Sequence, residues 1–174
     1  LRVTSLERTL ADLARREPYE WGVVAADAAL RRQGDLALLQ DYVDEGRRKP
    51  GNERLRAVLA SADGRSESAL ESMSRVSMAR AGIPMPVLQR EITDSNGGWI
   101  ATSDFAWEDI RVVGEADGRG KYSPEDTDRA TAADVIMAEK KRDQALVGAL
   151  WTPTHWGWDL ATNHIALGQH LRAV

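Results

Sequence analysis

A change from a helical to a strand-like pattern near the middle of the chain constrains its fold most strongly. Residues 87–93 and 99–107 have strand character, and Asp94-Ser95-Asn96-Gly97-Gly98 lies between them. Asn-Gly pairs favour the left-handed backbone of a tight hairpin turn. The sequence therefore predicts a β-hairpin, followed after a short turn at Glu108-Asp109 by a third antiparallel strand over residues 110–116.

The residues before this hairpin have helical periodicity and no strand pattern. Thr4-Ser5-Leu6-Glu7 forms a capping box, which marks the start of the first helix. Four helices are expected, at about residues 5–16, 19–32, 35–43 and 52–61. Ala62-Asp63-Gly64 is the predicted boundary between a helical segment, residues 1–62, and a second domain, residues 63–174.

The second domain is predicted to form a mixed β-sheet with helices on its faces. Its first helix begins at Ser66 and is ended by Gly82. Residues 118–132 are expected to form a loop, because they are rich in Gly, Ser, Asp and Thr. A helix, a strand and a last helix are then expected, at about residues 133–146, 150–156 and 160–172. This order predicts an α+β or α/β fold.

Charge and composition exclude several classes of protein. The chain has 174 residues, no cysteine and a formal net charge of -4. Disulfides and thiolate metal sites are therefore excluded, and the acidic balance argues against a protein that coats nucleic acid through a basic surface. No apolar run could span a bilayer, and no signal peptide is visible. We expect a cytoplasmic protein without a membrane partner and, because it begins with Leu1, a fragment or a processed product.

Three carboxylates are predicted to gather where the second and third strands meet. Asp104 lies in the second strand, and Glu115 and Asp117 lie two residues apart at the end of the third, so all three are expected to be neighbours. Clustered carboxylates repel one another unless a cation neutralises them, and their oxygens suit Mg²⁺ or Mn²⁺. Such an ion activates water for attack on a phosphodiester. Lys121 follows closely and would orient that water or stabilise the developing charge.

Other interpretations of the same residues remain open. Asp104 would equally suit an outward-facing surface position, and Asp117-Gly118 would suit an ordinary turn. The histidines, His155, His164 and His170, lack the spacing of a zinc pair and are expected to be surface or partly buried groups. The tryptophans at positions 151, 156 and 158 are expected to anchor a core or an interface rather than to stack on bases.

Several motifs follow one another between Ser66 and Leu160. They are Glu71, Gln89, Asp104-Phe105-Ala106-Trp107, Glu115-Ala116-Asp117-Gly118, Lys121-Tyr122, Glu139-Lys140-Lys141-Arg142-Asp143 and Trp151. Their order and spacing resemble the very-short-patch-repair-like endonuclease domains of the PD-(D/E)xK superfamily, which often end actinobacterial proteins related to the AbiEi antitoxin. Residues 4–15 and 26–30 resemble the middle helical segment of those AbiEi-like proteins. In that family a winged-helix DNA-binding module normally precedes this segment, and nothing in the chain corresponds to it.

The resemblance implies a restriction-endonuclease-like sheet and a metal-dependent endonuclease that hydrolyses DNA with a metal-activated water. It implies Asp104 and Glu115 as ligands of Mg²⁺ or Mn²⁺, with Glu71 and Asp117 supporting them and Lys121 positioning water or phosphate. Arg142 would contact phosphate or hold the acidic cluster together. Contacts with DNA are expected from Gln89, Lys140, Arg142 and the basic turn Arg47-Arg48-Lys49.

The resemblance also leaves room for a domain without activity. Gly114 interrupts the third strand where the family has an aliphatic residue, and Pro153 and His155 occupy the last strand where it has β-branched residues and an Arg. The alternative is therefore a catalytically inactive nuclease-fold module of an AbiEi-like antitoxin or transcriptional regulator. Its expected partners are a second copy of the chain, as a homodimer, and a cognate toxin.

Overall fold

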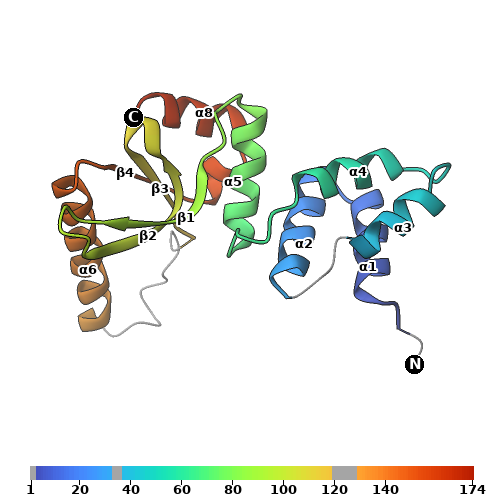
Figure 1. The fold of residues 1–174 in the computed structure, drawn as a ribbon, viewed down its shortest axis with the longest axis horizontal. Coiled ribbons are helices and arrows are strands. Elements are labelled where there is room, and N and C mark those ends of the chain that lie inside the picture. Colours follow the sequence, from blue (N-terminus) through green and yellow to red (C-terminus); the bar gives the residue numbers. More distant parts are fainter. Residues whose placement is uncertain (1–2, 33–36, 119–128) are drawn as a thin grey trace. The chain divides into compact units, whose positions relative to one another are not determined.

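The computed structural model of the protein describes residues 3–32, 37–118 and 129–174. Two compact units make up the chain, Leu1–Val76 (the helical unit) and Ser77–Val174 (the sheet unit) (Figure 1). Helix α5, Ala69–Arg80, runs through the division. The division lies beyond the predicted boundary at residues 62–64, because Val76 is buried in the core of the helical unit.

Within its described residues, the helical unit has four helices before α5, close to the predicted positions. They are α1 (Leu6–Arg16), α2 (Tyr19–Arg31), α3 (Ala37–Glu45) and α4 (Asn52–Ser61). The predicted cap of α1 is confirmed, since the hydroxyl of Ser5 accepts a hydrogen bond from the backbone N–H of Arg8 at 3.2 Å. Apolar side chains from these helices, among them Leu10, Val23 and Leu55, form one buried core.

The sheet unit contains a four-stranded mixed sheet in the order β1-β2-β3-β4. The strands are β1 (Val87–Thr93), β2 (Trp99–Trp107), β3 (Val112–Ala116) and β4 (Thr152–Trp156). The first three form the predicted antiparallel meander, and β4 pairs in parallel with β3 after the crossover helix α6 (Arg129–Gly148). The mixed sheet with flanking helices, and hence an α+β fold, is therefore confirmed.

Helices cover both faces of this sheet (Figure 1). Helix α6 contacts β2 and β4 on one face. On the other face, His170 of α8 (His164–Arg172) packs edge-on against Trp156 and bonds to Thr154 of β4. The short helix α7 (Trp158–Ala161) precedes α8, and the carbonyl of Ala161 accepts a hydrogen bond from Ser77 at 2.6 Å.

Several element boundaries differ from the predicted ones. Strand β3 begins at Val112 rather than at residue 110, because a 3-10 turn over Glu108–Ile110 leads into Arg111 with a left-handed φ of 56°. Helix α6 begins at Arg129, inside the predicted loop, and extends to Gly148. The single helix predicted for the C-terminus is two helices, because Asn163 interrupts it and caps α8 by accepting a hydrogen bond from Ala166.

Gly114 makes room for the aromatic core. The packing of that core compensates for the weaker strand that a glycine was expected to cause. A Cβ atom at this position would lie 2.5 Å from Cη2 of Trp156. The Trp156 ring stacks on Phe105 at a centroid distance of 5.3 Å, so both rings occupy the space above the glycine. Phe105 is fully buried and Trp156 is nearly so, so the stack is part of the core on that face of the sheet.

We predict that Gly114→Ala destabilises the sheet unit by about 1–3 kcal/mol, because an added methyl overpacks the stack against Trp156. Urea unfolding measures this change in the free energy of unfolding. Gly148→Ala is the matched control, since its added methyl meets nothing within 4 Å. Equal effects of the two substitutions would show that the close approach of Trp156 does not require glycine.

Candidate functional site

A row of four polar residues crosses the sheet, one from each strand. Gln89 of β1 lies opposite Asp104 of β2, because the residues on either side of them are paired in register. The register of β2 with β3 places Asp104 next to Glu115, and Glu115 is the direct partner of His155 in β4. The topology thus brings together Gln89, Asp104 and Glu115, which the sequence predicted as site residues. It also adds His155, to which the sequence assigned no role.

Two neighbouring groups orient the carboxylate of Asp104. Its Oδ1 accepts a hydrogen bond from Nε2 of Gln89 at 3.3 Å, and its Oδ2 accepts one from the backbone N–H of Ala116 at 2.9 Å. Gln89 has a left-handed φ of 50°, which is unusual for a residue inside a strand. The side chain of Asp104 is therefore held beside β3 from two sides.

Glu115 is the most deeply buried acid of the row, with 8% of its surface exposed. Its Oε2 lies 3.4 Å from Nη2 of Arg142 on α6. Its Oε1 is buried and has no hydrogen-bond partner among the described residues. Burial raises the pKa of Glu115 to about 7; the charge of Arg142 opposes this rise, and the charge of Asp104 adds to it.

Helix α6 supplies the charged groups that face β3 and β4. Nε2 of His155 lies 3.2 Å from Oδ2 of Asp143, and its Nδ1 lies 3.9 Å from Oε1 of Glu139. Glu139, Arg142 and Asp143 are spaced three and four residues apart, so they lie on one face of the helix. Lys140, predicted to bind nucleic acid with Arg142, is exposed and is not part of this face.

Asp117, the third predicted carboxylate, follows the end of β3. This strand ends at Ala116, so Asp117 lies one residue beyond it, and its place in the acidic cluster stays a prediction. The backbone N–H of Asp117 still donates to the carbonyl of Trp156 at 2.9 Å. Lys121 lies outside the described residues.

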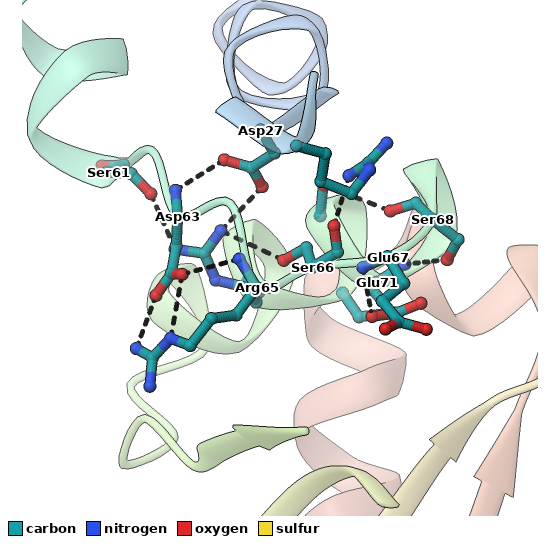
Figure 2. A network of polar contacts seen from close by, with 12 residues as sticks. Asp27, Ser61, Asp63, Arg65, Ser66, Glu67, Ser68 and Glu71 are labelled. Atoms are coloured by element: carbon teal, nitrogen blue, oxygen red, sulfur yellow. Dashed lines mark hydrogen bonds and ion pairs between the residues drawn. The ribbon is translucent and has the colours of Figure 1, made fainter. Parts of the chain in front are cut away.

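Glu71 belongs to the helical unit and caps the start of α5. Its Oε2 accepts a hydrogen bond from the backbone N–H of Glu67 at 2.7 Å, while the hydroxyl of Ser68 accepts one from the backbone N–H of Glu71 at 3.1 Å (Figure 2). This reciprocal arrangement resembles a capping box and stabilises the first turn of the helix. The predicted supporting role of Glu71 at a cation site stays a prediction.

The arrangement in the sheet unit fits a cation that needs few protein ligands. No group of three or more His, Asp or Glu side chains in the described part of the chain is placed to hold a metal ion. Mg²⁺, however, keeps several waters and commonly takes only one or two carboxylates from the protein. Asp104 and Glu115 provide two, and the buried, unpartnered Oε1 of Glu115 is an oxygen that a hard cation would satisfy.

Comparison with known proteins adds no functional information. No family model and no solved structure matches the chain. Two uncharacterized proteins of Mycobacterium tuberculosis, MT2308 of strain CDC 1551 / Oshkosh and Rv2248 of strain ATCC 25618 / H37Rv, are each 37% identical to it over 108 residues. The match covers 62% of this chain and 40% of each relative, so the chain spans less than half of their length.

Within residues 3–32, 37–118 and 129–174, no helix combines the length and the apolar character that crossing a bilayer requires.

Proposed function

We propose that the domain formed by residues 63–174 is a metal-dependent endonuclease that hydrolyses DNA phosphodiester bonds, of the very-short-patch-repair-like PD-(D/E)xK type. The observation that carries the proposal is the pair Asp104 and Glu115 on neighbouring strands, with Oε1 of Glu115 buried and unpartnered among the described residues. The order of elements from α5 to β4, a helix, three antiparallel strands, a helix and a parallel strand, supports the restriction-endonuclease-like fold that the resemblance implies.

The residues of the site would prepare it to bind a cation and a phosphate. Gln89 and the backbone of Ala116 hold Asp104 in place, so little reorganisation is needed when a cation binds. Arg142 occupies Oε2 of Glu115 and leaves Oε1 for the cation. When bound, Mg²⁺ would activate water and neutralise charge on the phosphate. The guanidinium of Arg142 would also attract a phosphate oxygen.

DNA cleavage tests this proposal. The protein is incubated with supercoiled and linear DNA in Mg²⁺ or Mn²⁺, with EDTA as the metal-free control. Cutting is expected in the presence of either ion and is expected to fall by at least about 100-fold in Asp104→Asn and Glu115→Gln, which remove charge that stabilises the reacting centre. Glu91→Gln, an exposed acid of β1, is the matched control and should cut normally. Cutting that persists in both site variants would place the activity elsewhere.

One observation favours a second candidate, the catalytically inactive nuclease-fold module of an AbiEi-like antitoxin or regulator. Glu115 already has a cationic partner within the chain, Arg142, and Asp104 already accepts two hydrogen bonds. A site with these internal partners depends less on a metal ion. Folded protein that neither cuts DNA nor binds Mg²⁺ or Mn²⁺ would favour this candidate.

A further inference from the structure

Four buried polar atoms without a hydrogen-bond partner among the described residues gather between β3, β4 and α6. They are Oε1 of Glu115, Nε of Arg142, Oδ1 of Asp143 and Nδ1 of His155. A buried polar atom without a partner costs about 1–3 kcal/mol, so folded proteins contain few of them. Such a concentration at one place indicates a binding site, because these atoms do not satisfy one another and remain available to a ligand.

Helix α6 holds these groups through two consecutive residues. Arg142 reaches Glu115 of β3 at 3.4 Å, and Asp143 reaches His155 of β4 at 3.2 Å. An ionised carboxylate can only accept hydrogen bonds, so the contact with Asp143 places a proton on Nε2 of His155 and fixes the orientation of the ring. Glu115 and His155 are register partners, so their side chains extend from neighbouring strands on the same face of the sheet.

We propose that Asp143 and His155 are positioning residues of the cation site. Asp143 orients His155, and the ring of His155, together with Arg142, restricts the Glu115 carboxylate so that Oε1 stays directed toward the cation. This inference rests on the proposed function of the site. It gives His155 and Asp143 the role of partners that orient a metal ligand without touching the metal, and such partners commonly contribute 10–100-fold to metal affinity.

Calorimetric titration of the whole chain with Mn²⁺ tests the inference without measuring activity. His155→Ala and Asp143→Ala are each expected to weaken Mn²⁺ binding by about 10–100-fold. The double variant should bind no more weakly than either single variant, because the two residues act as one unit. His155→Gln, which keeps an N–H near the position of Nε2, should recover most of the affinity. His164→Ala, at an exposed histidine of α8, is the matched control and should bind Mn²⁺ normally.

The outcomes separate this inference from the proposed function. Normal Mn²⁺ binding by folded His155→Ala and Asp143→Ala variants would overturn the positioning role and leave the metal site standing. A folded wild-type protein that binds no Mn²⁺ would overturn the metal site and the positioning role together. If His155→Ala does not fold, His155→Phe keeps the ring volume without its nitrogens and is expected to show the same loss of affinity.

Discussion

Replacing Asp27 by alanine is expected to destabilise the helical unit by about 3–5 kcal/mol, because it leaves the charge of Arg75 buried without its partner. Asp27 is fully buried in α2, and its Oδ2 accepts a hydrogen bond from Nη1 of Arg75 at 2.7 Å. Its Oδ1 accepts one from the backbone N–H of Asp63 at 2.7 Å, while Nη2 of Arg75 donates to the carbonyl of Ser61 at 2.7 Å. These two residues therefore attach the 61–66 segment and α5 to α2. Figure 2 shows the carboxylate of Asp27 beside Asp63.

Hydrogen exchange of the helical unit measures this loss, because it reports the stability of that unit within the whole chain. Arg8→Ala is the control. It removes an ion pair with Asp12 of similar length, 3.0 Å, but on the surface, where such a pair contributes at most about 1 kcal/mol. Similar protection factors in the two variants would mean that the buried ion pair does not hold the 61–66 segment.

Glu115→Gln is expected to stabilise the metal-free protein at pH 8 by about 3 kcal/mol and to have little effect near pH 4.5. The folded-state pKa of Glu115, about 7, lies above the ordinary value of 4.5. The folded protein therefore binds this proton more tightly than the unfolded chain does. The stabilisation is complete below pH 4.5 and is lost as the pH rises toward 7, because the buried carboxyl must then ionise. Glutamine stays neutral and avoids this loss.

Urea unfolding in EDTA across pH 4.5 to 8 measures the difference in the free energy of unfolding between wild type and Glu115→Gln. Glu91→Gln again provides the control, since Glu91 is exposed on the same sheet. A difference that does not grow with pH would mean that Glu115 ionises at its ordinary pKa and that its burial is compensated.

Local signals in the sequence predict most of the strands and helices. The bounds of β1, β2 and α4 match the predicted ones. The turn between β1 and β2 explains the first two, because the carboxylate of Asp94 accepts hydrogen bonds from the backbone N–H groups of Asn96 and Gly98, each at 2.8 Å. That Asp104 and Glu115 are neighbours was also predictable from a local signal, because a short turn joins their strands.

The parts of the site that depend on distant pairing could not be predicted. The register of β4 against β3 is set after the crossover through α6, so no local pattern indicates that His155 faces Glu115. The spacing of Glu139, Arg142 and Asp143 was visible as a helical face, but which face α6 turns toward the sheet depends on tertiary packing. The role of Gly114 was likewise hidden, because it depends on Trp156, which lies on a strand far along the chain.

We propose that Asp104 and Glu115 hold a divalent cation, and paramagnetic broadening by Mn²⁺ is the first test of this claim. In an NMR spectrum with substoichiometric Mn²⁺, the amide signals of Asp104, Glu115 and Ala116 should broaden first in the wild-type protein. The signals of Asp104 and Ala116 should stay sharp in Glu115→Gln, and all three should broaden normally in Glu91→Gln. No selective broadening around Asp104 and Glu115 in the folded wild-type protein would contradict the claim.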